Sequence, residues 1–500
     1  MAGELSAEAA REIRQLQKSR ERFRRDGNAA QEAAACNRLG MILAANGRFG
    51  EALEQHRAEL ELLEGAGDAL GSAVAHRRVG ESLAELHRFP QALQHQFQHL
   101  SLARSLSDPV EQQRAWATIG RTFLIMAESP EIAEIPEIPE LPEFPEFPTI
   151  PQGSQEAEGS QGSSGIPGNL GIPGVEAALR RALQAFHNSL SLLETRLEGL
   201  VPCRELAQMR SRLSLNLGLV QESLGNPRES SRLLRDSLRW ADQSHSLEDQ
   251  FRAHLNLGLL QQRLRDLPGA LRSLGRARDR ARDLGEPRLQ GEAEAHLGQV
   301  LLALGDFQGA RRSLRRARAL GQTDGTDGRR VRRGLRHASR VCRSLAALSR
   351  CDPAVPSLSL SLFERLGDSL ARLGHFQRAA EFYQKQLSLA ESLGLPGRDL
   401  ALIHVSLGCT FRDLGQHSRA LQHFQRELEL RKGEPQEECR TWLNVALCLE
   451  DSGSAPSQSE FLNPLTPMFL NPLGLLSPLR RALGCARSAA DPRLQVGRIR

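Results

Sequence analysis

Apolar residues recur along the chain in blocks of helical character, and each block places glycine directly after an aliphatic residue. The intervals between these glycines are 40, 40, 98, 40, 40, 69 and 41 residues. A nearly fixed interval of this size predicts stacked helical repeats, because one such unit cannot bury its apolar face without its neighbours. The eight glycines are Gly40, Gly80, Gly120, Gly218, Gly258, Gly298, Gly367 and Gly408.

Two further positions keep the same phase. Nine residues after the glycine stands a bulky residue, in Phe49, Phe89, Leu267, Phe307 and Phe376. Twelve residues after it stands alanine, in Ala52, Ala92, Ala270, Ala310, Ala379 and Ala420. We interpret each repeat as a helix pair whose glycine and alanine allow a close crossing, with the bulky residue filling the turn between the helices.

The order of glycine and then alanine is typical of tetratricopeptide repeats rather than of HEAT or armadillo repeats, although these intervals exceed the usual period of about 34 residues. Chance recurrence in a leucine-rich chain does not account for six copies in phase. We therefore predict an all-α, superhelical tetratricopeptide solenoid with disordered proline-rich insertions.

The repeats and the composition shifts between them predict the organisation of the chain. We expect a capping helix at 1–27, followed at 28–127 by repeats 1 and 2 and the first helix of repeat 3, and at 128–174 by a disordered insertion that is first Pro/Glu-rich and then Gly/Ser-rich. The second helix of repeat 3 and repeats 4 to 6 follow at 175–321, and a degenerate arginine-rich helical pair at 322–357. Repeats 7 and 8 with the first helix of repeat 9 occupy 358–450, before a proline-rich interruption at 451–477 and a last helix and tail at 478–500.

Proline stands at every third position in much of the first insertion, which excludes helix and favours polyproline II. Its glutamates would then share one edge of that helix. One hypothesis is that the insertion folds back as an acidic pseudo-ligand of the repeats. The alternative is a low-complexity segment without function.

Composition changes this picture little. The formal net charge is +5, and the only lysines are Lys18, Lys385 and Lys432, so the positive charge is almost entirely arginine. Such a bias also arises from a GC-rich gene, and arginine counts alone therefore do not indicate nucleic-acid binding. The eight cysteines form neither a C-x-x-C pair nor a disulfide-like pattern. With no long apolar run and no signal-peptide core, we expect a soluble intracellular protein.

In a tetratricopeptide superhelix the first helix of each pair lines the concave groove. Residues two and six positions before the glycine, or before Ala446 in the last repeat, share one face of that helix. Asparagine can bind the backbone of an extended peptide, and arginine can pair with its carboxylates. The expected groove therefore binds an extended acidic protein segment, with solvated arginines as the alternative. Its residues are Arg38, Arg78, Arg114, Arg212, Asn216, Arg252, Asn256, Arg440 and Asn444.

Other candidate chemistry is sparse. His95 and His99 have the spacing of a helical metal site but no third ligand nearby. The arginine-dense stretch Arg311–Arg343 is suited to phosphate contacts or nuclear import, and equally to a solvated helix. No nucleotide-binding, hydrolase or metalloprotease motif occurs. We expect no metal, no cofactor and no enzymatic activity.

Several stretches resemble the tetratricopeptide region at the N-terminus of the Tonsoku-like family. They include RAWATIGRT at Arg114–Thr122, ALEQHRAEL at Ala52–Leu60 and RTWLNVAL at Arg440–Leu447, with further matches at 73–85 and 379–387. The resemblance implies a nuclear scaffold for homologous recombination at damaged or stalled replication forks. It also implies partners: an MMS22-like protein, histones H3 and H4, histone chaperones and the replicative helicase.

In that family, histone-tail recognition is attributed to ankyrin repeats that follow the tetratricopeptides, and no residue here carries it. The resemblance therefore suggests an N-terminal fragment, located in the nucleus on chromosomes at replication forks and also in the cytoplasm. Repeats of about 40 residues occur as well in Leu-Gly-Asn-repeat polarity adaptors and in kinesin light chains. A cytoplasmic spindle or cargo adaptor is the alternative function, and direct nucleic-acid binding through the arginine-dense stretch is a third.

Overall fold

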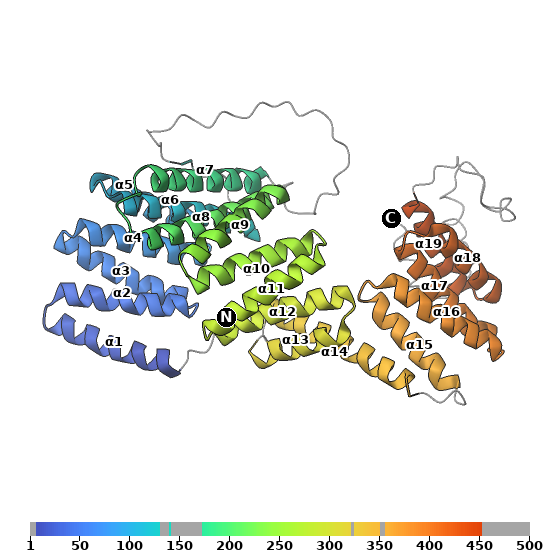
Figure 1. Ribbon diagram of the computed structural model, residues 1–500. Coiled ribbons are helices and arrows are strands. Elements are labelled where there is room, and N and C mark those ends of the chain that lie inside the picture. The colour runs from blue at the N-terminus through green and yellow to red at the C-terminus, as the bar shows by residue number, and fades with distance from the viewer. Residues whose placement is uncertain (1–6, 131–139, 142–172, 322–324, 351–355, 453–500) are drawn as a thin grey trace, which may run out of the picture. The chain divides into compact units, whose positions relative to one another are not determined.

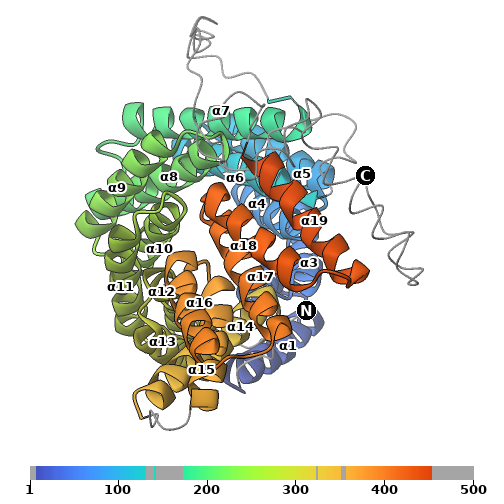
Figure 2. The same ribbon diagram turned by 90° about the vertical axis from the view of Figure 1, so that its right-hand side faces the viewer.

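A computed structural model describes residues 7–130, 140–141, 173–321, 325–350 and 356–452. Within these residues the secondary structure is nineteen α-helices, without a strand (Figure 1). The predicted all-α tetratricopeptide solenoid is confirmed. The chain divides into two compact units, residues 1–286 and 287–500. The stacking of helices inside each unit is also visible in the turned view of Figure 2.

Eleven helices of the described residues build the first unit, and consecutive helices pack against each other. Their bounds are α1 (Ala7–Arg25), α2 (Ala29–Ala45), α3 (Phe49–Ala66), α4 (Ala69–Glu85), α5 (Phe89–Ser105), α6 (Pro109–Glu128), α7 (Pro173–Thr195), α8 (Cys203–Ser223), α9 (Pro227–Gln243), α10 (Leu247–Arg263) and α11 (Leu267–Asp283).

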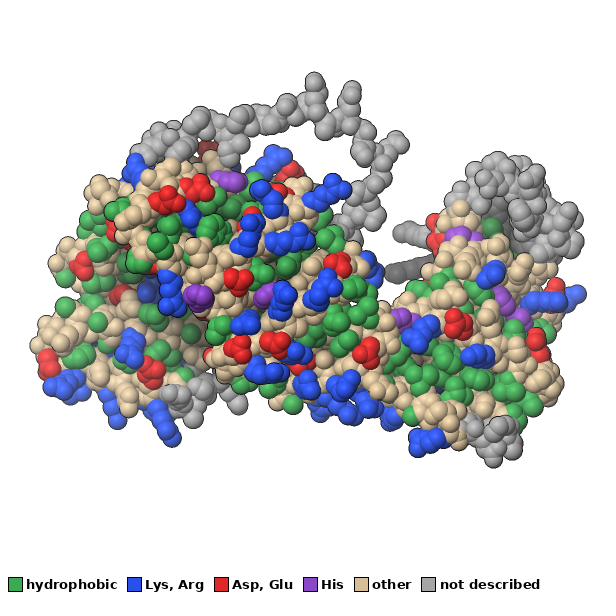
Figure 3. Space-filling model, in the orientation of Figure 1, with side chains coloured by type: hydrophobic (Ala, Val, Ile, Leu, Met, Phe, Trp, Pro, Cys, Tyr) green, Lys and Arg blue, Asp and Glu red, His purple; other side chains and the backbone are tan. Residues whose placement is uncertain are grey.

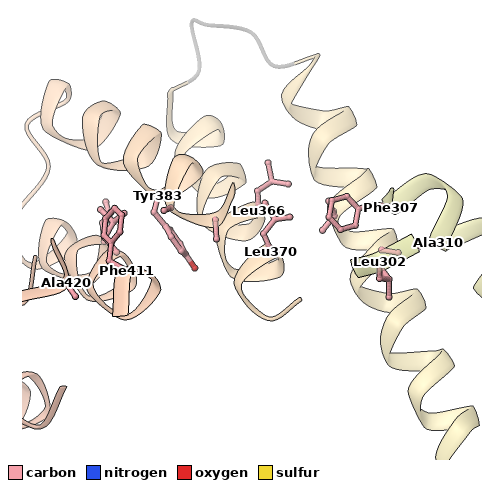
Figure 4. Close-up of a cluster of buried hydrophobic side chains, with 14 of the residues drawn as sticks. Leu302, Phe307, Ala310, Leu366, Leu370, Tyr383, Phe411 and Ala420 are labelled. Atoms are coloured by element: carbon pink, nitrogen blue, oxygen red, sulfur yellow. The ribbon is translucent and has the colours of Figure 1, made fainter. Parts of the chain in front are cut away.

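Eight helices of the described residues build the second unit. Their bounds are α12 (Pro287–Leu304), α13 (Phe307–Ala319), α14 (Gly325–Leu348), α15 (Pro356–Ala371), α16 (Phe376–Ser392), α17 (Gly397–Asp413), α18 (His417–Leu430) and α19 (Pro435–Asp451). Figure 4 shows part of the buried apolar cluster of this unit, with Leu302, Phe307, Leu366, Tyr383 and Phe411 among the labelled side chains.

Each recurring glycine lies where a large side chain of the paired helix packs against it. A Cβ atom at Gly298 would lie 2.5 Å from the Cδ2 atom of Leu314, and one at Gly408 would lie 2.5 Å from the Cε1 atom of Phe424. Such contacts are too short for real atoms, so a side chain at the glycine position would force the opposing side chain to move. The alanines at the twelfth position are fully buried, as the pattern predicts, but the side chain that fills the space over the glycine comes four residues later. These side chains are His56, Gln96, Leu234, Leu274, Leu314, Tyr383 and Phe424.

In every glycine-containing pair except repeat 3, the turn has one left-handed residue seven positions after the recurring glycine. Gly305 has a φ angle of 82°, whereas His87 and Arg265 adopt φ angles of 59° and 63° at the equivalent position. Left-handed backbone is accessible to glycine without strain and disfavoured for side chains with a Cβ atom. The second helix then begins behind a cap such as Asp306, whose Oδ1 atom accepts from the Gly309 amide at 2.8 Å.

Repeat 3 is formed across the first insertion. α6 packs on α7, and a Cβ atom at Gly120 would lie 2.7 Å from Phe186 of α7. The predicted disordered segments at 128–174 and 451–477 and the last helix at 478–500 lie almost entirely outside the described residues, and so does the pseudo-ligand hypothesis.

The expected helical pair at 322–357 is not observed: its described residues 325–348 form one helix, α14, of 24 residues. The sequence offers no turn there. Val331, Gly334, Ala338 and Val341 recur at helical spacing, and all four are buried. Gly334 approaches Leu302 and Leu314, so α14 packs on both helices of the preceding pair.

No helix of the described residues combines the length and the apolar character needed to cross a bilayer.

Candidate protein-binding groove

The first helices of repeats 1 to 3 line a cavity of about 310 Å³, called here the α2–α6 cavity. α4 contributes Arg78, Glu81 and Glu85, which follow one helical face at spacings of three and four residues. The cavity is therefore lined by residues two positions before and one and five positions after the recurring glycine. α6 contributes the equivalent set, Thr118, Arg121 and Ile125.

Apolar and charged groups alternate on this surface. The apolar part of the cavity wall is formed by Met41 and Ala44 of α2 and by Phe49 of α3. Of the surface of Met41, 46% is exposed. Arg121 Nη2 lies 3.1 Å from Glu85 Oε1 and so joins α6 to α4 across the groove surface. The charges of the cavity are thus mixed.

Two buried polar atoms of the cavity have no partner among the described residues. They are Nε of Arg78 and Oε1 of Gln96. The side chain of Gln96 is fully buried, and its Nε2 atom donates to Thr122 Oγ1 at 2.7 Å. Burial lowers the pKa of Arg78, and the neighbouring Arg77 lowers it further. An unsatisfied donor and an unsatisfied acceptor match the two polar groups of a peptide backbone.

The structure places only Arg78 of the nine predicted groove residues in this cavity. The Asn256 amide donates to the Arg252 carbonyl oxygen of its own helix at 2.9 Å. Asn216 and Asn444 are partly exposed, and neither amide is hydrogen-bonded to another described residue.

The other five predicted arginines form ion pairs within the chain. Arg38 binds Glu12 at 2.8 Å, Arg212 binds Asp249 at 3.1 Å, and Arg252 and Arg440 bind acids of their own helices. Sequence spacing alone did not reveal the pairing of Arg38 and Arg212, because their carboxylates lie on neighbouring helices.

Arg114 belongs to a partly buried network that joins α5, α6 and α8. Its Nη1 atom lies 2.6 Å from Glu111 Oε1 and its Nη2 atom 3.2 Å from Glu205 Oε1. Burial alone would raise the pKa of Glu111, but a hydrogen bond from His99 and the charges of Arg77 and Arg114 outweigh it and hold the pKa at about 2. Arg114 is therefore committed to an internal role.

His95 and His99 do not converge on a common point. The Nδ1 atom of His95 lies 2.8 Å from that of His76, whereas His99 Nε2 lies 3.0 Å from Glu111 Oε2. Each ring is engaged by a different partner. No group of three or more metal-ligating side chains occurs among the residues that the structure describes.

Fold and groove together define a tetratricopeptide scaffold, a class of proteins that binds other proteins. A family model for the tetratricopeptide repeat matches residues 358–433, from α15 to just beyond α18. The apo form of the quorum sensor NprR from B. thuringiensis covers 76% of this chain and 83% of its own, at 11% identity and a TM-score of 0.40. A likeness this low supports no inference about function.

Two curated relatives identify the family. The chain is 39% identical to the Tonsoku-like protein of Bos taurus over 485 residues, which are 97% of this chain and 31% of that protein. It is 39% identical to the Tonsoku-like protein of Danio rerio over 443 residues, which are 89% of this chain and 28% of that protein. Over the stretch that it shares, the chain belongs to the Tonsoku-like family, and the resemblance seen in the sequence is confirmed. It spans less than a third of the length of these relatives.

Proposed function

We propose that this chain is a non-enzymatic interaction scaffold in homologous-recombination repair of stalled or broken replication forks. Its location in the cell would be the nucleus, on chromosomes at replication forks. Membership in the Tonsoku-like family supports the process, and the same membership supports an MMS22-like protein, histones H3 and H4, histone chaperones and the replicative helicase as partners. The repeat fold supports the scaffold role.

The α2–α6 cavity is the proposed contact point of an extended acidic protein segment. The observation that carries this proposal is the pair of unsatisfied buried atoms, Arg78 Nε and Gln96 Oε1, in one cavity. A peptide carbonyl or carboxylate would accept from Arg78, and a peptide amide would donate to Gln96. Met41 and Phe49 would contact the apolar part of a side chain.

The ion pairs reduce the number of predicted groove residues that are available to a partner. An acidic segment that bound Arg38 or Arg212 would have to displace Glu12 or Asp249, and the Asp249 carboxylate is buried. Arg78 faces no such competition from a hydrogen-bonded carboxylate of the described residues. We therefore propose that Arg78 contributes more to affinity than any other predicted arginine.

The test recovers partners from nuclear extract on the full chain, and on the Arg78→Gln and Arg38→Gln variants. Arg38 is the matched control because it occupies the equivalent repeat position but pairs with Glu12. Recovery of fork and histone-chaperone proteins by the parent chain and the control, and its loss with Arg78→Gln, would support the proposal. Recovery of spindle or motor proteins instead would favour the cytoplasmic adaptor, and equal recovery by all three would move the binding site elsewhere.

A further inference from the structure

Helix α14 has two faces of opposite character. Val331, Gly334, Ala338 and Val341 are buried against the neighbouring helices. On the opposite face, spacings of four, three, four and three residues align five arginines over about 21 Å of helix, at 1.5 Å per residue. We call these the arginine stripe: Arg329, Arg333, Arg336, Arg340 and Arg343.

The charges of the arginine stripe are not neutralised. Four of its members are exposed and Arg340 is partly exposed. No described carboxylate forms an ion pair with any of the five. Arg336 and Arg343 donate to backbone oxygens one turn earlier in their own helix, at 3.4 and 3.2 Å, and those bonds leave the positive charge uncompensated.

Helix α13, which packs beside α14, extends the basic surface. It carries five arginines and no acidic residue, and only Arg316 of these forms an ion pair with a described carboxylate, that of Glu294 at 3.4 Å. Lys and Arg side chains accordingly gather over α13 and α14 along the lower edge of the molecule in Figure 3. Burial lowers the pKa of His337 in α14, and the surrounding arginines lower it further. The smaller, arginine part of that shift is the effect expected of a positive local field.

The same arginine bias has a different outcome on α9 and α11. There, Arg232 pairs with Glu229, and Arg280 pairs with Asp283 at 3.2 Å. Arg239 and Arg278 likewise pair with acids of their own helices. A composition bias of the gene would raise arginine on all four helices, but it does not explain why acids are missing from α13 and nearly missing from α14.

We propose that the arginine stripe, together with α13, binds the phosphate backbone of duplex DNA. A duplex presents one phosphate per about 1.7 Å of its axis, hence about twelve along the length of the stripe. Arginine forks pair with phosphate in bidentate fashion. α13 and α14 contain no tyrosine or tryptophan, and their one phenylalanine, Phe307, is buried, so a platform for stacking unpaired bases is missing.

Phosphate contacts carry no sequence information, so binding would be independent of sequence and strongly dependent on salt. The choice of DNA over RNA rests on the proposed function. The proposal is otherwise separate from the α2–α6 cavity, which belongs to the first unit, so either one can fail without the other.

Fluorescence anisotropy of the full chain with a labelled duplex of about 20 base pairs, between about 50 and 200 mM NaCl, tests the proposal. The stripe variant carries Arg329→Gln, Arg333→Gln, Arg336→Gln and Arg343→Gln. Loss of four phosphate contacts should reduce the slope of log affinity against log salt by about 3 to 4 and weaken binding at least about tenfold near 100 mM. Replacing the same four residues by lysine should retain most of the affinity.

The matched control removes four neutralised arginines, by Arg232→Gln, Arg239→Gln, Arg278→Gln and Arg280→Gln. It has the same change in formal charge, and its affinity should stay within about threefold of the parent chain. Circular dichroism checks that every variant is folded. The proposal is overturned if the parent chain does not bind the duplex at low salt, or if both variants lose affinity equally. Preference for single-stranded DNA, for duplex RNA or for a polyglutamate peptide of equal charge would overturn it as well.

Discussion

Two consecutive repeats, α10–α11 and α12–α13, pack in the same way around their glycines and differ on their exteriors. Inside, Gly258 faces Leu274 and Gly298 faces Leu314, and both second helices begin behind an aspartate cap. Outside, α11 intersperses its arginines with aspartates, whereas α13 has no acid at all. The comparison teaches that the packing around the glycine fixes the fold and is shared by the two repeats, so differences in function must be sought first on the outer surface.

The largest effect on stability should come from placing a side chain at the glycine positions where the two helices of a pair cross. Gly258→Ala and Gly298→Ala each place a Cβ atom 2.5 to 2.7 Å from a leucine side chain, so each should lower the free energy of unfolding by about 1–3 kcal/mol. Urea unfolding followed by circular dichroism measures this. The control is Gly275→Ala in α11, where a Cβ atom meets nothing within 4 Å; it should stabilise the protein by about 0.5–1 kcal/mol. Equal effects at all three sites would refute a common interior.

The two repeats should differ in how their stability depends on pH, because the buried residue four positions before the glycine differs between them. It is His254 in α10 and Glu294 in α12. Burial, together with the smaller effect of the charges of Arg276 and Arg280, lowers the pKa of His254 to about 4. The unfolded chain binds this proton near pH 6.5, so the stabilising effect of the neutral ring is complete above that pH and is lost as pH falls toward 4.

Stability should therefore fall between pH 6.5 and 4, and His254→Leu should reduce that fall by about 1–3 kcal/mol. Urea unfolding at pH 7.5 and pH 4.5 measures the difference. Some pH dependence should remain in the variant, because burial also lowers the pKa values of His95 and His423 to about 4. A variant with the full pH dependence of the parent chain would rule out His254 as a contributor.

The left-handed turn residue is Arg265 in one repeat and Gly305 in the other. Gly305→Ala should destabilise by about 1 kcal/mol, since alanine is strained at a φ angle of 82°. Arg265→Gly removes that strain and loses only backbone entropy, so its effect should be stabilising and below about 1 kcal/mol. Thermal unfolding of both variants measures the difference, and a loss of stability with Arg265→Gly would contradict it.

The smallest expected effect on stability comes from changing the surface charges of α11 and α13, and it compares the two exteriors directly. Arg278→Gln with Arg280→Gln removes ion pairs to Asp279 and Asp283 and should lower stability by a few tenths of a kcal/mol. Arg312→Gln with Arg315→Gln removes like-charge repulsion on α13 and should raise stability by a similar amount. In about 1 M NaCl both effects should vanish. The same sign for both pairs at low salt would show that the two surfaces do not differ in electrostatics.

The repeat interval and the buried alanines were predictable from sequence, because both rest on residue types that recur at fixed positions. The side chain over each glycine was not, because His56, Gln96, Leu234 and Tyr383 share size rather than chemical type. The sequence signal that could have identified this side chain was its constant position, sixteen residues after the glycine. The single helix α14 was missed because the sequence interval alone left room for two.

The groove was only partly predictable. Helical periodicity indicated Arg78, which the structure places in the α2–α6 cavity, but the positions that line this cavity also include Glu81 and Glu85, one and five residues after the glycine. The pairing of Arg114 with Glu205 and of Arg212 with Asp249 joins separate helices. Which acids meet which arginines is set by packing, and one sequence does not encode it locally.

The most direct test of the central claim, that the outer surface of α13 and α14 differs functionally from that of α11, is arginine-specific chemical labelling. The full chain would be treated with an arginine-selective dicarbonyl reagent, with and without duplex DNA, and each modified residue quantified by mass spectrometry. The account predicts that DNA protects Arg329, Arg333, Arg336 and Arg343 while the reactivity of Arg280 and Arg282 is unchanged. Equal protection of both sets, or protection of the α11 arginines alone, would contradict it.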